Sequence, residues 1–560
     1  MSTLVREKEV SSSASSAHFD SQGVVEAAKG VNSNNATLNY NEPPPFRIAS
    51  LWEKPVVNPL NGKSQTLPMF NLANPYTRNF HLSWLGFFVA FLSWFAFPPL
   101  IPEAIKTDLK LTTAQIGNSN ITALASTLAN DVAFFLSRSG VRLIMGPFVD
   151  RFGPRKVMAA LLLLGAIPSG LAGTITNYKG LYIIRFFIGI LGATFVPCQA
   201  WTTAMFDKNI VGTANAFTGG WGNLGGGVTF VVQVALFQAL LNDGLSSHSA
   251  WRAAFAIVPC PILIFVAILC LVFGTDCPAG KWSERHTMPA SSIAMSRGHL
   301  TTLDASQRRI AEQKMTDKEA GKVTVQEAVD DDVAEQLHDI DVAVAEKPSI
   351  AGTLKIATTP YTWLPSIMYM TTFGFELAVD ANLASVLFAV HKSPSFGQLK
   401  AGYYASIFGF LNVWTRPLGG ILGDMIGKRW GPKGKKYATL TCGFLQGVLS
   451  LAYGLHTLHA FTHGNKKGPS LGFQIGLIVV MAIFNEMANG LNFSLVPHCV
   501  PYSNGIITGI VGAAGNLGGI IYALMFRFHP QQGYAAAWWI SGIFAMVVNL
   551  MVIAIPPPKH

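Results

Sequence analysis

Hydrophobic residues along the chain gather in long runs that polar stretches separate, and the runs fall into two groups of six. Each run is close to the roughly 20 apolar residues that a helix needs to cross a membrane. The first group lies at about 82–102, 121–148, 157–176, 179–203, 211–241 and 251–275. The second lies at about 361–390, 402–425, 437–458, 471–493, 503–527 and 535–556. The pattern predicts an all-α membrane protein with 12 transmembrane helices in two six-helix bundles.

The polar stretches around these runs set the predicted domains. They are an N-terminal tail (1–78), a first bundle (79–275), a central loop (276–359), a second bundle (360–556) and a C-terminal tail (557–560). The acidic central loop is expected to be solvated and disordered. Basic loops, "DRFGPRK" and "GKRWGPKGKK", follow the second and eighth runs. Because such loops mark the cytoplasmic side, we expect both termini and the central loop to be cytoplasmic.

Composition supports a membrane protein and narrows its function. Hydrophobic residues make up 50% of the 560 and charged residues only 12%, against about 25% charged in soluble domains. The net charge of +10 fits basic membrane flanks, so nucleic acid is not an expected partner. The cysteines form no paired motif, and no cluster of metal ligands or nucleophile–base pair lies in the runs. We therefore expect no metal, no cofactor and no enzymatic activity.

The two groups of runs share internal repeats. The segment "RLIMGPFVD", from Arg142 to Asp150, is matched by "RPLGGILGD", from Arg416 to Asp424. "GWGNLGG" in the fifth run is matched by "AAGNLGG" in the eleventh. The matched glycines are Gly219, Gly222, Gly225 and Gly226 in the first half, and Gly512, Gly515, Gly518 and Gly519 in the second. Matched pairs in the same order indicate a duplicated transporter fold.

Arg142 and Arg416 are the residues most indicative of function. Arginine at the centre of a membrane helix costs about 2.5 to 3.5 kcal/mol, which favours a functional role over the alternative that each side chain reaches the interface. A guanidinium can donate two parallel hydrogen bonds, a geometry suited to a small planar oxyanion. Two facing cations would repel one another unless an anion lay between them. The pair therefore predicts an anion site that closes only when it is filled.

The glycine motifs predict close helix contacts. Spacings of three and four residues place the glycines on one helical face, where the missing side chains let another backbone approach. Asn223 and Asn516 lie within these motifs. Either they donate hydrogen bonds to the anion, or they only join helices.

With these motifs the chain resembles the major facilitator superfamily over about residues 80–556. "GPFVDRFGPRK" looks like the superfamily's loop motif between helices 2 and 3, and "GGILGDMIGKRWGPKGK" looks like its copy between helices 8 and 9. The motif residues in this chain are Asp150, Arg151, Gly153, Arg155 and Asp424. The resemblance gives them a conformational role through cytoplasmic salt bridges. Within the superfamily, the two arginines and the glycine–asparagine motifs resemble the nitrate/nitrite porter family, and the long central loop resembles that of its fungal members.

The resemblance implies further site residues and helix contacts. Helices 5 and 11 should meet helices 8 and 2 of the opposite half, which carry the arginines. Tyr369 and Phe373, four residues apart in the seventh run, should contact the planar ion, with core packing the alternative for Phe373. Asn223 and Asn516 are expected in the site. Arg185 resembles the helix-4 arginine of proton-coupled members, or it tethers its helix near the interface.

Two acidic residues in the seventh run, Glu376 and Asp380, are candidate proton carriers, because carboxylates inside a membrane are usually functional. The alternative places both near the outer, water-exposed end of the helix.

One segment departs from the family pattern. Family members place a threonine about one turn before the helix-2 arginine, whereas "ANDVAFFLSRSGV" separates Thr127 from Arg142 here. Removing residues 130–140 would restore the usual spacing. Our hypothesis is that a mispredicted exon boundary inserted these residues, and retention of their codons in the transcript would dismiss it.

The resemblance implies a multi-pass plasma-membrane symporter that imports nitrate with protons, with nitrite as a candidate second substrate. A nitrate/nitrite exchanger, a porter for another small anion and a nitrate sensor without transport remain alternatives. The central loop carries Ser291, Ser292, Thr301 and Thr302, which would suit regulatory kinases or ubiquitin ligases as partners.

Overall fold

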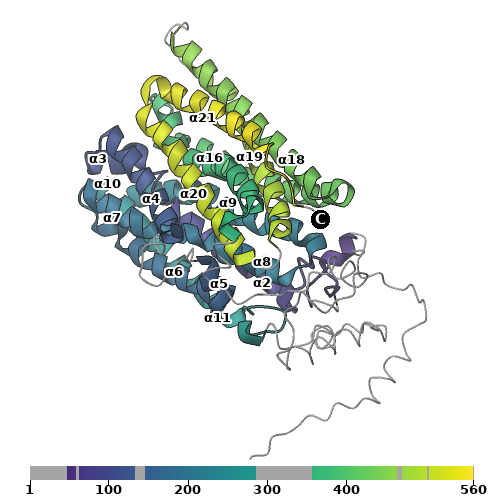
Figure 1. The fold of residues 1–560 in the computed structure, drawn as a ribbon. Coiled ribbons are helices and arrows are strands. Elements are labelled where there is room, and N and C mark those ends of the chain that lie inside the picture. Colours follow the sequence, from purple (N-terminus) through teal and green to yellow (C-terminus); the bar gives the residue numbers. More distant parts are fainter. Residues whose placement is uncertain are drawn as a thin grey trace, which may run out of the picture.

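The computed structural model describes residues 47–58, 62–132, 145–284, 356–462, 469–500 and 504–558. Within these residues the regular structure is helical, apart from a few isolated bridges between extended residues. Figure 1 shows the helices of the first half, in blue, beside those of the second half, in green to yellow. The predicted all-α membrane fold is confirmed.

The first half contains helices that fall within the six predicted runs, and several of these runs hold two helices. They are α2 (Pro75–Trp94), α4 (Thr113–Val132) with α5 (Met145–Phe152), α6 (Pro154–Gly170), α7 (Tyr178–Ile188) with α8 (Phe195–Met205), α9 (Lys208–Asn242), and α10 (Ser247–Ile257) with α11 (Pro259–Phe273). Two short helices, η2 (Ile101–Ile105) and α3 (Lys106–Asp108), follow α2. The helix α2 starts before the predicted apolar run, because the Asn74 side chain accepts a hydrogen bond from the Thr77 amide at 2.8 Å and caps its N-terminus.

The second half consists of α16 (Pro360–His391), α17 (Gln398–Leu411), α18 (Thr415–Thr462), α19 (Leu471–Cys499), α20 (Asn504–Phe528) and α21 (Gln531–Val552). The helix α18 contains the end of the eighth predicted run and all of the ninth. The two parts meet at Gly431, whose φ of 61° lies in the left-handed region that favours glycine. Nine stretches of the described chain are long and apolar enough to span a membrane, and one of them, Gln398–Thr462, holds both of these runs.

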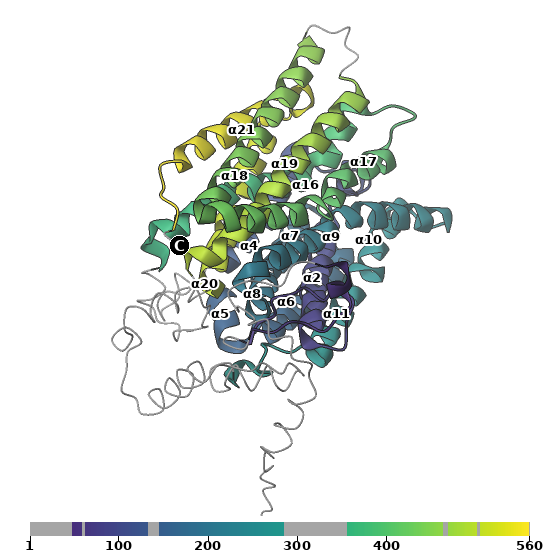
Figure 2. The same ribbon diagram turned by 90° about the vertical axis from the view of Figure 1, so that its right-hand side faces the viewer.

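The long helices α9 and α20 lie where the halves meet. The helix α9 packs on α2 of its own half and on α17, α18 and α19 of the other. The helix α20 packs on α16 of its own half and on α4 and α5 of the other. Figure 2 shows α9 between the two groups of helices. The fifth and eleventh spans thus contact the eighth and second spans across the interface.

The described part of the predicted N-terminal tail contacts the helical bundle. Ser64 pairs with Phe206 in a short parallel bridge. The Asn58 amide donates to the Asp207 carboxylate at 2.7 Å, directly before α9. These contacts hold the segment against the connection between the fourth and fifth spans.

Candidate functional site

A break in the eighth span positions Arg416. The chain turns at Asn412–Trp414 between α17 and α18. Pro417 has no amide hydrogen, so the carbonyl of Val413 cannot receive the usual helical hydrogen bond. That carbonyl instead accepts a hydrogen bond from the Trp221 indole of α9 at 3.3 Å. Arg416 therefore follows a helix interruption that the opposite half supports, an arrangement typical of transporter binding sites.

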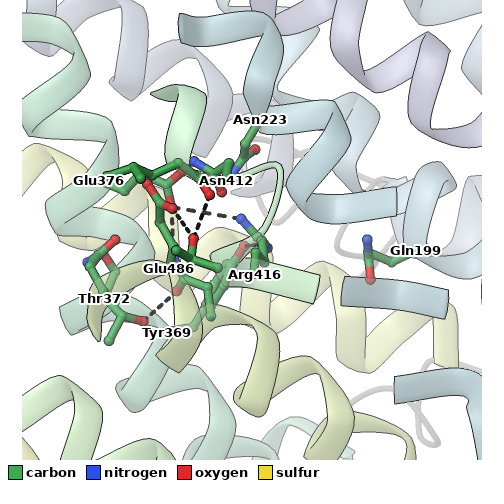
Figure 3. Close-up of polar contacts among 12 residues, drawn as sticks. Gln199, Asn223, Tyr369, Thr372, Glu376, Asn412, Arg416 and Glu486 are labelled. Atoms are coloured by element: carbon green, nitrogen blue, oxygen red, sulfur yellow. Dashed lines mark hydrogen bonds and ion pairs between the residues drawn. The ribbon is translucent and has the colours of Figure 1, made fainter. Parts of the chain in front are cut away.

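The Arg416 guanidinium is buried between the halves, with only 1% of its surface exposed. Its Nη2 donates to the Tyr369 hydroxyl at 2.8 Å, and its Nη1 lies 3.8 Å from the Glu376 carboxylate. Figure 3 shows both contacts. Among the described residues, Arg416 Nε and Nη1 have no hydrogen-bond acceptor. A buried guanidinium with free donors can take a planar anion in two parallel hydrogen bonds.

Aromatic rings form one wall beside this cation. Tyr369 and Phe373 stack on α16 with ring centroids 4.7 Å apart and 10° between planes. Phe195 of the first half stacks on both, at 5.7 and 5.8 Å. The guanidinium carbon of Arg416 lies 5.7 to 6.0 Å from the three ring centroids. The structure thus brings the predicted residues Tyr369, Phe373 and Arg416 together with rings from both halves.

Glu376 is the acceptor at the centre of a cluster of side-chain amides. Its Oε1 accepts hydrogen bonds from Asn223 at 2.8 Å and Asn412 at 2.9 Å, and its Oε2 accepts one from Asn489 at 2.7 Å. Asn223 comes from α9 of the first half, whereas the others come from the second. Glu376 is fully buried. The amides and Arg416 therefore compensate its charge, as a carboxylate at such a site requires.

Two further carboxylates lie buried near this cluster. Asp380, one turn along α16, is 3% exposed and has no hydrogen-bond donor or ion-pair partner among the described residues. Glu486 of α19 is fully buried and accepts a short hydrogen bond from Thr415. Glu376 and Asp380 are therefore both enclosed by other side chains in this structure.

The predicted glycines create the space for these side chains. A Cβ at Gly219 would lie 3.0 Å from Arg416 Nε, and one at Gly515 would lie 2.8 Å from the rings of Tyr369 and Phe373. The remaining motif glycines face neighbouring groups: Gly222 the Phe87 ring, Gly225 the Phe88 carbonyl, Gly226 the Asp380 carboxylate, Gly512 the Phe195 ring, Gly518 the Met370 carbonyl and Gly519 the Leu377 side chain. The glycine faces thus let α9 and α20 approach the side chains around Arg416.

Two predicted site residues, Arg142 and Asn516, are not part of the contacts described above. Arg142 and residues 133–144 around it lie outside the described residues, as do most of the suspected insertion and the side chain of Asp150. Asn516 is buried on α20, next to Gly515.

The loop-motif residues lie apart from the side chains around Arg416 and Glu376. Arg155 pairs with Asp276 at 3.4 Å within the first half, and Arg151 is exposed. A Cβ at Gly153, whose φ is +87°, would lie 2.5 Å from the Asp276 carboxylate. Burial raises the pKa of Asp276, and the charge of Arg155 opposes that shift.

Asp424 joins the two halves directly. It accepts hydrogen bonds from the amide and hydroxyl of Thr213 on α9, at 2.7 and 2.8 Å. Lys435 lies 3.4 Å from the same carboxylate. This contact lies at the end of the bundle that the basic loops predict to be cytoplasmic.

Arg185 forms a second polar cluster, away from Arg416. It is 2% exposed and donates to Ser119 at 2.7 Å and to Asn120 at 2.6 Å, both on α4. Its guanidinium also lies 5.6 Å from the centre of the Phe97 ring. Arg185 thus links α7 to α4 through buried hydrogen bonds.

The sequence prediction missed Asn412, Asn489 and Glu486. A carboxylate in the apolar run "AIFNEMANG" was a sufficient signal for Glu486. The two asparagines gave no such signal, because single amides are common in membrane helices as links between helices.

Comparison with known proteins shows which families share this sequence and fold. The Major Facilitator Superfamily matches residues 83–523. The high affinity nitrate transporter 2.5 of Arabidopsis thaliana is 31% identical over 89% of this chain and 83% of its own length. The nitrate/nitrite transporter NrtP of Nostoc punctiforme is 28% identical over 82% of this chain and 88% of its own. The solved structure of the proton:xylose symporter XylE aligns with a TM-score of 0.54 at 15% identity, over 86% of this chain and 96% of that one.

The fold and the interface between its halves are those of a membrane transporter. The chain belongs to the major facilitator superfamily and, within it, to the nitrate/nitrite porter family.

Proposed function

We propose that this protein imports nitrate across the plasma membrane together with protons, by alternating access of its two halves. Arg416 holds the anion from the second half, and Arg142 is its counterpart from the first. The part of Arg142 in the proposal rests on the sequence repeat. Nitrite is the second proposed substrate, because it is also a small planar anion and suits the same site. The termini and the central loop, with its serines and threonines for kinases or ubiquitin ligases, are cytoplasmic in this proposal.

The observation that carries the proposal is the buried Arg416 guanidinium, whose Nε and Nη1 lack acceptors among the described residues. Leaving charged donors unpaired inside a membrane is costly, and an anion with two acceptor oxygens would satisfy them. The stacked rings of Tyr369, Phe373 and Phe195 favour a flat ion beside them over a bulky one. The names of the relatives support nitrate as that ion.

Glu376 provides the route to proton coupling. Its carboxylate and the transported anion compete for the same guanidinium, since Glu376 lies 3.8 Å from Arg416 Nη1. Protonation of Glu376 removes this competitor and leaves Arg416 free for nitrate. By linkage, nitrate binding then favours protonation to the same extent. The proton and the anion therefore bind together on one side and leave together on the other.

Import of nitrate against the membrane potential requires more protons than Glu376 alone can carry. An interior-negative potential opposes entry of a monovalent anion by about 2.3 kcal/mol per 100 mV. One proton per nitrate only cancels that cost, so net electrical driving force needs a second proton. Asp380 and Glu486, both buried, are the candidates to carry it.

The proposal is tested by uptake of labelled nitrate and by voltage-clamped current in a cell without nitrate transport of its own. The wild-type chain should accumulate nitrate with an inward current that grows as external pH falls. Arg416→Gln should abolish uptake, and Arg416→Lys should retain only a small part of it, because lysine lacks the planar fork. Arg429→Lys, at an exposed position on the same helix, is the control and should behave as wild type.

The alternatives give different results. Uptake that needs internal nitrite, with no inward current, would indicate a nitrate/nitrite exchanger. Unlabelled formate or chloride is compared with unlabelled nitrate as an inhibitor of labelled nitrate uptake. Inhibition by formate or chloride at the lower concentration would indicate that another anion is the preferred substrate. Saturable binding without accumulation would indicate a sensor. Unchanged uptake by Arg416→Gln would overturn the proposed site itself.

A further inference from the structure

A cavity of about 310 Å³ lies between the two halves at the end of the bundle away from Asp424. Its lining includes Lys106, Thr113 and Ile116 of the first half, and Ser385, Lys392 and Tyr534 of the second. The predicted orientation makes this the outer end of the protein. The walls come from segments that must separate when a transporter opens outward.

The cavity is lined by two cations and by no carboxylate among its described residues. Lys106 and Lys392 both line it, and the Lys392 ammonium lies 5.0 Å from the centre of the Phe388 ring. The nearby carboxylate of Asp108 is neutralised by Arg252 at 2.7 Å. Glu103, one turn before Lys106, is exposed but does not line the cavity. The charged residues of the lining are therefore two cations from opposite halves, which favour an anion.

The inner end of this cavity is closed by a polar contact between the halves. Asn120, one turn beyond the lining residue Ile116 on α4, donates to the side-chain oxygen of Asn382 at 3.1 Å and to the carbonyl of Ala381 at 3.2 Å. Arg185 fixes the orientation of that amide by donating to its oxygen at 2.6 Å. Asn382 is in turn one turn before the lining residue Ser385. The cavity is thus a vestibule in front of a shut outer gate.

We propose that this vestibule is a second anion site, in which Lys106 and Lys392 concentrate a small monovalent oxyanion before the Asn120–Asn382 contact opens. The identity of the anion as nitrate rests on the proposed function above. Clefts lined by one sign of charge raise the local concentration of an oppositely charged ligand by about tenfold or more at low ionic strength. Salt screens exposed charges over about 10 Å at 0.1 M, so the effect depends on salt.

The first test is uptake kinetics of Lys106→Gln/Lys392→Gln. At low ionic strength the KM for nitrate should rise by about three- to tenfold with the maximal rate unchanged, and the difference should shrink at high salt. The matched control is Lys110→Gln/Lys400→Gln, which removes two exposed lysines near the same end that do not line the cavity. An equal change in both double variants, or none in the first, would overturn the proposal.

The second test does not depend on transport. Ser385→Cys places a thiol in the cavity wall, and its modification is followed with an anionic and a cationic methanethiosulfonate reagent. The anionic reagent should react faster, and this preference should fall several-fold on Lys106→Gln/Lys392→Gln but not on the control pair. Labelling of the parent protein gives the background of the native cysteines. If the anionic reagent does not react faster than the cationic one, the proposed anion site in the vestibule is wrong. If it does react faster but the protein takes up no nitrate, only the proposed function is wrong.

Discussion

Arg416 and Glu376 form an ion pair of 3.8 Å in which both side chains are almost completely buried. The separation is longer than that of a hydrogen-bonded pair, so Arg416 Nη1 retains a free donor among the described residues. Glu376 meanwhile accepts three amide hydrogen bonds from α9, α19 and the turn before α18. These amides thus hold the Glu376 side chain in place when protonation releases Arg416 for the anion.

Replacing Glu376 by glutamine should separate anion transport from protons. The neutral side chain no longer competes for Arg416, so nitrate binding should tighten and become less dependent on pH. Uptake down a nitrate gradient should continue, while the ratio of uptake at pH 5.5 to that at pH 7.5 falls well below that of wild type, and any remaining pH response comes from the second proton carrier. Uptake from solutions of both pH values, with and without an imposed nitrate gradient, measures this. Glu376→Asp, which keeps a titratable group, should retain a pH response, and a full pH response in Glu376→Gln would exclude Glu376 as the coupling residue.

The Tyr369 hydroxyl should contribute to the affinity for nitrate, whereas the Tyr369 ring provides the stacking. Tyr369→Phe keeps the ring on Phe373 and Phe195 but removes the 2.8 Å hydrogen bond to Arg416 Nη2. A hydrogen bond to a charged group contributes about 1.5 kcal/mol, so the KM for nitrate should rise about tenfold. Tyr403→Phe, at a position 40% exposed, is the control. A KM within twofold of wild type would show that the hydroxyl does not orient the cation.

Much of the fold could be predicted because spans of a membrane protein are local features of the sequence. Long apolar runs report helices directly, and the repeated arginine and glycine motifs identify the halves. The break at Asn412–Trp414 was not predicted, because the apolar run continues through it and Pro417 alone does not fix where a helix ends. The described residues before α2 were assigned to a tail because Ser64 and Asn58 reach the segment at Phe206 and Asp207 only through the backbone and a single side chain.

The candidate site could be predicted only where one residue is unusual by itself. Arg416 and Glu376 are charges in apolar runs, and Tyr369 follows from the family resemblance. The amides that surround Glu376 come from three separate elements, and their convergence depends on helix packing across the interface. The sequence also could not show that Arg416 lies beside Glu376 and not beside solvent. Such relationships require the assembled halves.

The close approach of Gly219 to Arg416 predicts a strong effect of a single methyl group. In Gly219→Ala the new Cβ would lie 3.0 Å from Arg416 Nε and 3.3 Å from Cζ, so the guanidinium must move or α9 must separate from α18. We expect nitrate uptake to fall at least tenfold with normal protein levels in the membrane. Gly476→Ala is the control, since its Cβ meets nothing within 4 Å and alanine favours a helix by about 1 kcal/mol. Wild-type uptake by Gly219→Ala would show that this contact is not needed.

Asp108 should make the stability of the outer end depend on pH. The carboxylate accepts hydrogen bonds from His248 at 2.8 Å, Arg252 at 2.7 Å and Trp251 at 3.0 Å. Burial alone would raise the pKa of Asp108, but these hydrogen bonds and the charge of Arg252 outweigh it and lower the pKa below its ordinary value. A carboxyl group whose pKa is lowered by folding stabilises the protein above its unfolded pKa, about 3.9, and loses that contribution as pH falls through the folded pKa.

Asp108→Asn should therefore lower the Tm of the purified protein by a few degrees at pH 6 to 7, and the difference from wild type should narrow below about pH 4. Thermal unfolding in detergent from pH 3 to 7 measures both. Asp243→Asn, at an exposed position, is the matched control and should leave the Tm unchanged at every pH. A Tm difference for Asp108→Asn that stayed constant down to pH 3 would show that the charge of the carboxylate does not contribute. The Tm difference is expected to narrow at low pH because only the ionised carboxylate of Asp108 attracts Arg252. This ion pair joins the connection between the first and second spans to α10.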